Sequence, residues 1–179
     1  MPPLALHARP PQMKSMDLTQ LRPNVGIVLI SAAGQVWLGR RAKTPPPHNW
    51  QFPQGGIDAG EGDLDAALRE LREETGVTSV RLLARTRDWI GYEFPPEHAG
   101  SKIAKGWRGQ KQIWFAFAFE GEDAEIDLAA HGHEVEFDAW RWAELEEALD
   151  GIVEFKRDTY RQVIDAFGPV VDEVRAGAA

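Results

Sequence analysis

Apolar and β-branched runs alternate with turn residues in the first third of the chain. Residues 24–30 (NVGIVLI) predict a buried strand, and Gly34 is expected to turn the chain into a second strand at residues 35–39. These two segments therefore predict a hairpin. Three consecutive prolines exclude regular structure at residues 44–48, so this segment is expected to be a loop that leads into residues 50–53.

A helix from residue 63 to about residue 75 is the clearest element. Asp63 is expected to be its N-cap, and Gly76 is expected to end it. Apolar residues recur at helical spacing and predict one buried stripe. The stripe consists of Leu64, Ala67, Leu68 and Leu71.

The remaining pattern predicts an α/β domain in which helices flank a mixed sheet. Strands are expected at residues 80–86, 113–119 and 137–142, helices at 142–149 and 155–167, and an irregular loop at 91–110. No repeat or linker interrupts the pattern. We therefore expect one domain at residues 21–168, a flexible extension at 1–20, and a partly frayed tail at 169–179.

Composition agrees with a single globular domain. The chain has 179 residues, of which 43% are hydrophobic and 27% are charged. No segment approaches the roughly 20 apolar residues that cross a bilayer, and the N-terminus has no secretory signal pattern. We expect a soluble, cytoplasmic protein with no membrane partner. The absence of cysteine excludes disulfides and thiolate metal sites.

Charge is unevenly distributed along the chain. The net charge of -8 argues against a general nucleic-acid coat protein, and DNA is not an expected partner. Residues 120–150 are strongly acidic, whereas residues 36–49 and 81–111 lean towards basic residues. This asymmetry suits a site that holds both cations and phosphates. Solvated loops and a solvated acidic face explain the charge pattern equally well.

Three glutamates project from one sector of the predicted helix. Because helical residues advance by about 100°, Glu70, Glu73 and Glu74 lie together, opposite the apolar stripe. Like charges at this spacing are unfavourable without a cation. Oxygen ligands without cysteine or paired histidines favour Mg²⁺ or Mn²⁺ over zinc, and calcium suits phosphate chemistry less well. The alternative is a solvated helix face decorated with ion pairs.

The spacing around these glutamates resembles the signature of the Nudix hydrolases. Gly55 is followed after five residues by Glu61 and after seven more by RELREETGV, residues 69–77. The resemblance implies an α/β/α sandwich with a loop–helix–loop catalytic motif. It also implies a hydrolase that cleaves phosphoanhydride bonds with the help of divalent metal ions.

The resemblance implies roles for individual residues of this motif. Glu70, Glu73 and Glu74 would bind metal or activate water, and the carbonyl group of Gly55 would be a further ligand. Arg69 would orient a glutamate by ion pairing. The identity of the general base stays open, since it varies among relatives and could lie outside the motif.

Segments outside the motif resemble the RNA pyrophosphohydrolase and dinucleoside polyphosphate hydrolase branch of this family. They are RPNVGIVLI (22–30), GRRAK (39–43), NWQFPQGGID (49–58), GQKQIWF (109–115), EFDAWRW (136–142) and FKRDTYRQV (155–163). This resemblance implies removal of pyrophosphate from 5′-triphosphorylated RNA, a step in RNA 5′-end processing and mRNA decay. Dinucleoside polyphosphates are the alternative substrate. Glu136 would be a metal ligand, with Glu134 as the alternative.

Substrate contacts also follow from the resemblance. Arg22 and Arg41 match arginines that contact phosphate, which suits their bidentate geometry. Phe155 and Lys156 match positions near the first bases, where a ring can stack and an ammonium group can meet phosphate. Ordinary helix packing is the other interpretation of Phe155.

Other polar positions have weaker indications. Gln112, with Lys111, could face the nucleotide from the start of a strand, or could lie in a surface turn. His131 and His133 lack a recognisable partner set and are interpreted as loop residues. A nucleotide-sensing module that does not cleave its ligand is a third functional hypothesis, but the motif retains all three glutamates. The sequence indicates no oligomeric state.

Overall fold

Two parallel strands form the centre of the sheet. The computed structural model of the chain describes residues 16–98, 106–129, 132 and 134–179. In it, β1 (Leu21–Ile30) pairs with β7 (Gly109–Phe119) from Leu21 opposite Gly109 to Ile30 opposite Ala118. Both strands are almost entirely buried. Their near-continuous apolar sequences are typical of strands covered on both faces.

Shorter strands extend this centre on both sides. The sheet order is β3-β2-β1-β7-β5, with β4 paired to β1, β6 to β7 and β8 to β2. The β1–β2 hairpin is confirmed, with Ile30 opposite Val36. The strand bounds are β2 (Val36–Arg41), β3 (Trp50–Gln51), β4 (Gln54–Gly56), β5 (Val80–Arg85), β6 (Ile90–Glu93) and β8 (Phe137–Ala143).

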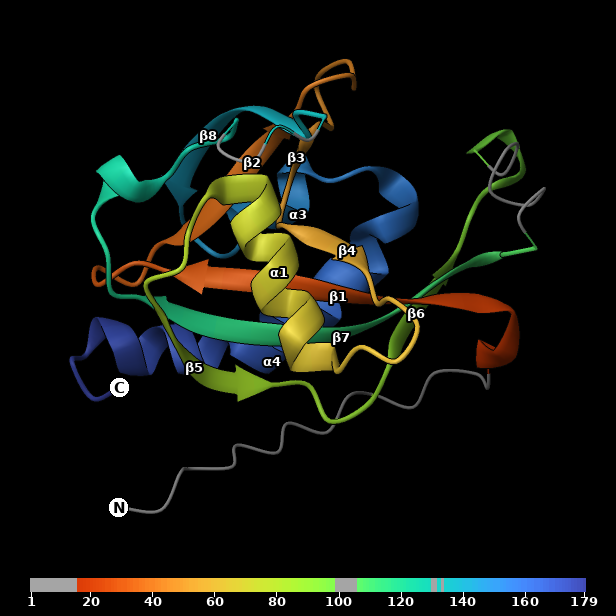
Figure 1. Cartoon of the computed structure of the whole chain (residues 1–179). Coiled ribbons are helices and arrows are strands. Elements are labelled where there is room, and N and C mark those ends of the chain that lie inside the picture. The colour runs from red at the N-terminus through yellow and green to blue at the C-terminus, as the bar shows by residue number, and fades with distance from the viewer. Residues whose placement is uncertain (1–15, 99–105, 130–131, 133) are drawn as a thin grey trace.

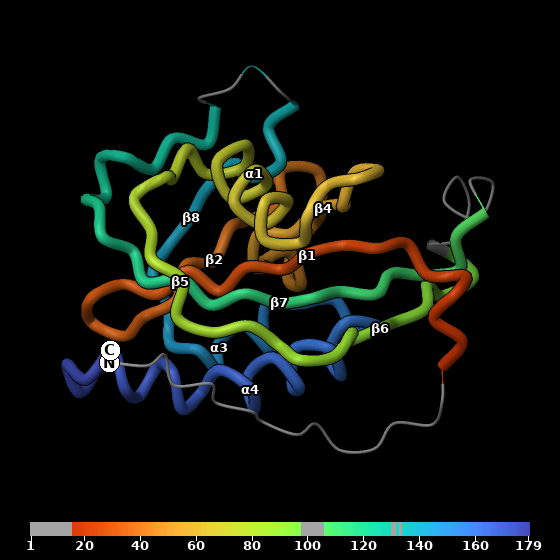
Figure 2. Tube along the Cα trace, turned by 60° about the horizontal axis from the view of Figure 1, so that its bottom comes forward, coloured from red at the N-terminus to blue at the C-terminus, as the bar shows by residue number. Residues whose placement is uncertain are grey.

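Helices cover both faces of the sheet, so the predicted α/β/α sandwich is confirmed (Figures 1 and 2). One face packs against α1 (Asp63–Thr75), and the other against α3 (Glu147–Gly151) and α4 (Arg157–Arg175). Alternate residues of each central strand point to opposite faces. In β1, Ile27 packs in the core beneath α1, whereas Val28 packs in the core against α4.

The bounds of α1 differ from the prediction by one residue. Gly62, not Asp63, is the N-cap, because the backbone is still extended there and Asp63 already belongs to the helix. Gly76 ends the helix in the left-handed conformation with φ of 75°, as expected. Leu68 is wrong as a stripe residue, since it is 39% exposed. Ala66 is buried instead.

Two predictions in the second half of the chain are wrong because tertiary pairing decides the local structure. Residues 90–93, placed partly in an irregular loop, form β6 against residues 109–112 of β7. The strand predicted at 137–142 is confirmed as β8, but Trp142, also placed at the start of the next helix, lies in that strand opposite Trp37. The helix that follows is correspondingly shorter and is α3. Residues 99–105 of the predicted loop lie outside the described residues.

The C-terminal helix is longer than expected, and the prediction of a frayed tail is wrong as far as Arg175. The helix continues through Pro169, and Val170 and Val171 are buried beneath the sheet. At its end, Nη2 of Arg175 donates to the Gly34 carbonyl oxygen at 3.1 Å and to Glu144 at 2.8 Å. Burial of these residues outweighs the helix-breaking tendency of the proline.

The predicted N-terminal extension lies mostly outside the described residues. Its last part forms the short 3-10 helix η1 (Leu18–Gln20), whose N-terminus is capped by the Asp17 side chain. Met16 and Leu18 lie against Gly91 of β6. The domain bounds at residues 21 and 168 stay predictions. None of the helices in the described part of the chain has the length and apolar character needed to cross a membrane.

Because Val171 packs in the core after the proline, we expect Val171→Ala to lower the free energy of unfolding by about 1.5 to 3 kcal/mol. Urea denaturation measures this change. Asp165→Ala, at an exposed position of the same helix, is the control and should change it by less than about 0.5 kcal/mol. Equal stability of Val171→Ala and wild type would contradict the packing of this end.

Candidate active site

A glycine-rich strand and the glutamate helix form one wall of the site. β4 pairs with β1, with Val25 opposite Gly55, and α1 packs beside it. A Cβ atom at Gly55 would overlap the carboxyl group of Glu70. At Gly56 a Cβ atom would overlap the guanidinium group of Arg22. A side chain at Gly55 would displace the partly buried Glu70 carboxyl group, whereas at Gly56 the exposed Arg22 side chain could move aside.

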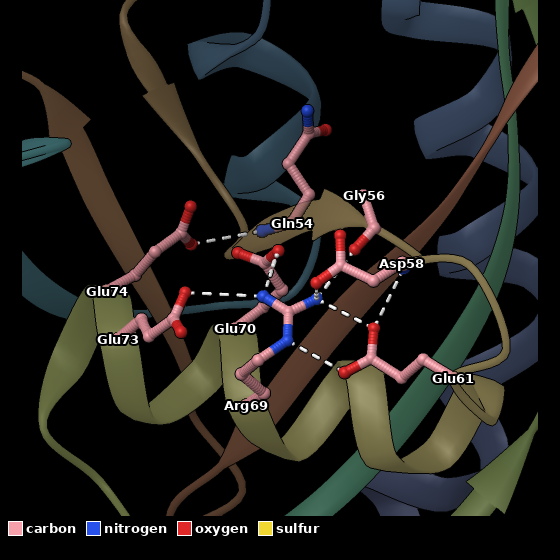
Figure 3. A network of polar contacts seen from close by, with 8 residues as sticks. All are labelled: Gln54, Gly56, Asp58, Glu61, Arg69, Glu70, Glu73 and Glu74. Carbon is pink, nitrogen blue, oxygen red and sulfur yellow. Dashed lines mark hydrogen bonds and ion pairs between the residues drawn. The ribbon is translucent and has the colours of Figure 1, made fainter.

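Arg69 lies at the centre of the charged groups of this wall (Figure 3). Its Nε and Nη2 atoms donate to the two carboxylate oxygens of Glu61, at 2.8 and 2.9 Å. Its Nη1 atom donates to Glu70 at 2.8 Å and to Glu73 at 3.3 Å. Nη2 also donates to the carbonyl oxygen of Gly56 at 2.8 Å. One guanidinium group thus ties the loop before α1 to two of the predicted catalytic glutamates.

These contacts shift the acidity of the groups around the arginine. The bonds from Arg69, with one from the Asp58 backbone, lower the pKa of Glu61 to about 2. Burial raises the pKa of Glu70, although its bond with Arg69 acts in the opposite direction. The bonds to Glu61 and Glu70 raise the pKa of Arg69 itself. Glu61 and Arg69 are therefore a permanently charged pair at neutral pH.

Glu74 has a different environment from the other two helix glutamates. Its carboxylate accepts the backbone N–H of Gln54 at 3.1 Å. Burial raises its pKa well above the ordinary value, and the charges of Glu70 and Glu136 raise it further. The positive charge of Arg41 only partly offsets this. Glu74 is the carboxyl group of this site that most needs a cation to remain ionised.

The position of Arg69 shows that not all three helix glutamates need a metal ion to balance their charge. Arg69 already offers a positive charge to Glu70 and Glu73, so the cation requirement falls mainly on Glu74. Among the described residues, no three aspartate, glutamate or histidine side chains converge on a point that would hold a metal ion. The guanidinium group of Arg69 bridges two of the carboxylates instead.

The donor groups nevertheless suit a hard divalent ion. Glu70 and Glu74 supply carboxylate oxygens in a partly desolvated setting, and the Gly55 backbone lies directly against the Glu70 carboxyl group. Magnesium is typically held by one or two carboxylates together with waters and substrate phosphate. Glu70 and Glu74, with the charge of Glu136 acting on Glu74 and the Gly55 backbone beside Glu70, fit that pattern.

Two ion pairs join the end of β2 and the residues just after it to the segment leading into β8. Arg41 pairs with Glu136 at 2.8 Å, and both side chains are little more than a third exposed. Lys43 pairs with Glu134, and these two side chains are mostly exposed. Only Glu136 of the two acids contributes to the raised pKa of Glu74. This geometry favours Glu136 over Glu134 as a participant in the site.

The predicted substrate-contact residues occupy different surroundings. Arg22 is exposed beside Gly56. Lys156, in the 3-10 helix η4 (Glu154–Lys156), is only 7% exposed, and its Nζ atom lies 3.3 Å from Oε1 of Gln54. Phe155 packs against Tyr92 with ring centroids 5.8 Å apart. Helix packing therefore accounts for at least one contact of Phe155.

Gln112 is not in a surface turn, so that alternative is wrong. It lies within β7, is 1% exposed, and donates to Asn24 at 2.9 Å and to Gln54 at 3.2 Å. Lys111 has the opposite orientation, and its Nζ atom lies 5.1 Å from the ring centre of Trp89. His131 and His133 lie outside the described residues.

Two residues of the site had no predicted role. Gln54 contacts Glu74 through its backbone and Lys156 through its side chain. Tyr92, within the segment predicted as an irregular loop, is buried, and its hydroxyl group donates to Gln110. The position of Gln54 next to Gly55 in NWQFPQGGID is a sequence signal for it. Tyr92 offers no comparable local signal, since its placement depends on the pairing of β6 with β7.

Known proteins resemble this chain over most of its length. The NUDIX domain matches residues 20–163. An RNA pyrophosphohydrolase from Caulobacter vibrioides (strain NA1000 / CB15N) is 60% identical over 156 residues, which are 87% of this chain and 90% of that protein. One from Agrobacterium fabrum (strain C58) is 48% identical over 163 residues, covering 87% and 95% of the two chains.

Solved structures share the fold at low identity. A C. elegans Ap4A hydrolase binary complex has a TM-score of 0.59 at 21% identity, covering 83% of this chain and 99% of that one. The E. coli dihydroneopterin triphosphate pyrophosphohydrolase has a TM-score of 0.61 at 20% identity, covering 79% and 95%. Identity this low supports the architecture and nothing finer.

We expect the Glu61–Arg69 pair to stabilise the protein in a pH-dependent way. The folded pKa of Glu61 is about 2, below the ordinary 4.5, so its contribution is present above about pH 4.5 and is lost as the pH falls towards 2. Glu61→Gln should lower the free energy of unfolding at pH 7 by about 1 kcal/mol, after solvent screening. Denaturant unfolding between pH 2.5 and pH 7 measures the difference.

The matched control is Glu120→Gln, which removes a half-exposed pair with Arg81. Its effect should stay within about 0.5 kcal/mol across the same pH range. A destabilisation by Glu61→Gln that is the same at pH 2.5 and pH 7 would show that the pair does not account for it.

Proposed function

The chain belongs to the NUDIX family and is a hydrolase of acid-anhydride bonds, and we propose that it removes pyrophosphate from the 5′-triphosphate end of RNA. The observation that carries this proposal is the 60% identity, over 87% of the chain, to a protein named RNA pyrophosphohydrolase. The site adds a buried carboxylate wall and arginines beside it. The products would be a 5′-monophosphate RNA and pyrophosphate. We place this reaction in the cytoplasm.

The carboxylates and one backbone group would hold the metal. NUDIX hydrolases generally use divalent ions, and we propose Mg²⁺, with Mn²⁺ as a substitute. Glu70, Glu74, Glu136 and the Gly55 carbonyl group are the proposed ligands. When bound, the ion would neutralise phosphate charge and favour ionisation of an attacking water. Glu73 and Glu74 are the candidates for taking up the proton of that water, and the geometry leaves both open.

The other residues would bind and orient the substrate. Arg69 would keep Glu70 and Glu73 in place through the bonds that it already makes. Arg22 and Arg41 would bind phosphate oxygens, for which the planar guanidinium group is suited. Phe155 and Lys156 would meet the first nucleotides. In the reaction, a bond forms between the water oxygen and phosphorus, and the anhydride bond between the α- and β-phosphates breaks.

Dinucleoside polyphosphates are the second candidate substrate. The motifs outside the catalytic box resemble enzymes of both activities, and the same carboxylate wall would serve either. A competition assay decides between them: triphosphorylated RNA and diadenosine tetraphosphate at equal concentration with Mg²⁺, followed by identification of the products. We expect pyrophosphate and monophosphorylated RNA to predominate. Cleavage of the dinucleotide alone would refute RNA as the main substrate.

Glu74→Gln should lower kcat for pyrophosphate release at least 100-fold, because an amide cannot become the anionic oxygen that is proposed to bind the metal or accept a proton. Glu122→Gln, at an exposed position on the far edge of the acidic segment, is the control and should behave like wild type. Release of labelled pyrophosphate from end-labelled RNA measures both. Full activity of Glu74→Gln would show that Glu74 is not needed for the reaction, whereas absence of release by the wild type would favour the hypothesis of a nucleotide-sensing module.

Gly55→Ala should reduce kcat about 100-fold, since the new methyl group overlaps the Glu70 carboxyl group and must displace it. Gly168→Ala is a matched control, because a Cβ atom there meets no atom within 4 Å among the described residues and the position is helical. The control should keep wild-type activity. Wild-type kcat in Gly55→Ala would show that the position of Glu70 is not critical.

A further inference from the structure

A chain of three side-chain amides, two of them buried, links β4, β1 and β7. Nε2 of Gln112, on β7, donates to Oδ1 of Asn24 on β1 at 2.9 Å. The same nitrogen donates to Oε1 of Gln54 on β4 at 3.2 Å. Gln112 and Asn24 are 1% and 2% exposed. Three strands that are distant in sequence are thus joined by one amide nitrogen.

Gln54 connects this chain to both functional parts of the site. Its Oε1 atom accepts from Nζ of Lys156 at 3.3 Å as well as from Gln112. Its backbone N–H donates to Glu74 at 3.1 Å. The Lys156 ammonium group also lies 5.6 Å from the ring centre of Tyr92. A single residue therefore contacts both the proposed substrate lysine and Glu74.

The orientation of the Gln112 amide is determined by its partners. Asn24 and Gln54 both present oxygens, so only the nitrogen of the amide can face them. The cost of this orientation is visible at the other end of the amide. Oε1 of Gln112 is buried without a hydrogen-bond partner among the described residues. A side chain that leaves one polar atom unpaired to donate twice with the other is expected to have a purpose beyond packing.

Lys156 fixes the orientation of the Gln54 amide, and Gln54 in turn fixes that of Gln112. An ammonium group only donates, so Lys156 needs the oxygen of the Gln54 amide and not its nitrogen. The Gln112 nitrogen requires the same oxygen. If Gln54 turned its amide over, its NH₂ group would face two donors at once. Gln112 thereby holds the acceptor in place for the lysine.

From these contacts we propose that Gln54 and Gln112 are positioning residues that set the place of the Lys156 ammonium group. Gln112, predicted from the sequence as a substrate contact, acts through Gln54 and does not touch the substrate. This inference rests on the proposed function, in which Lys156 meets the RNA. The proposed site then includes Gln54 and Gln112 of the sheet as well as the residues that contact the substrate.

The test is a double-mutant cycle between Gln112 and Lys156, with triphosphorylated RNA and Mg²⁺. Gln112→Met keeps the length of the side chain and removes both donated bonds. We expect it to raise KM about threefold to tenfold in the wild-type background. In the Lys156→Met background it should have no further effect, because the group that it positions is gone. A purely structural role would give the same additional loss in both backgrounds.

Thr86→Val is the matched control for loss of a buried hydrogen bond in this part of the sheet. Its hydroxyl oxygen accepts the Trp114 backbone N–H at 3.0 Å, away from Lys156. It should lower the melting temperature to a similar extent as Gln112→Met and leave KM unchanged. A KM increase of the same size in Thr86→Val would overturn the specific role of Gln112.

A second measurement needs no substrate. The ¹⁵Nζ NMR signal of Lys156, assigned by its loss in Lys156→Met, should shift in Gln112→Met and stay in place in Thr86→Val. An unmoved signal, or additive effects in the cycle, overturns the positioning role. Wild-type release of pyrophosphate from RNA decides the proposed function separately. If wild type releases none, the proposed function fails, and the NMR signal alone decides the positioning role.

Discussion

The ion pairs of Arg69 are the interaction on which the rest of the site depends. A helix that presents Glu70, Glu73 and Glu74 on one sector, next to Glu61, concentrates negative charge in a partly buried place. One guanidinium group reaches three of these acids and also a carbonyl oxygen of β4. It joins the helix to the strand beside it, and it leaves Glu74 as the acid without such compensation.

Glu61 and Glu74 differ in their preferred protonation state, because only Glu61 has a hydrogen-bonded arginine beside it. Glu61 is held in the charged form by its bonds with Arg69, whereas burial favours the neutral form of Glu74. A divalent ion would compete with protons for Glu74, but the Glu61–Arg69 pair would need no such help. The loop before α1 can therefore keep its structure while the metal-binding side of the helix changes its charge. This separation follows from burial and hydrogen bonding and not from residue type.

The layered fold could be predicted from the sequence because short local patterns determine most of its strands and helices. Continuous apolar runs predict the strands around residues 24–30 and 113–119, and one capped amphipathic pattern predicts the helix at 63–75. The prediction was wrong for β6, whose structure depends on pairing with β7. It was also wrong for the end of α4, where burial of Val170 and Val171 stabilises the helix beyond Pro169. Such contacts are absent from any local window.

The candidate site shows the same limit. The spacing of the Nudix signature identifies Gly55 and the glutamates, because each of them has a fixed position in that pattern. It does not show that Gln112 is buried, because its neighbours Asn24 and Gln54 are 88 and 58 residues away along the chain. Nor does it show that Arg41 and Glu136, predicted for phosphate and metal respectively, lie close enough to pair with each other. Each is the other's neighbour only through the β2–β8 pairing.

The length of α4 has a practical consequence for attaching labels to the protein. The helix begins next to Lys156 and ends at Arg175, which is fastened to the turn at Gly34. Nineteen residues at about 1.5 Å each separate the two ends by about 28 Å. A fluorescent dye attached after Ala179 would therefore lie beyond the Arg175 end of α4, at least the length of that helix away from Lys156 along the chain. Its signal would be insensitive to events at the catalytic carboxylates.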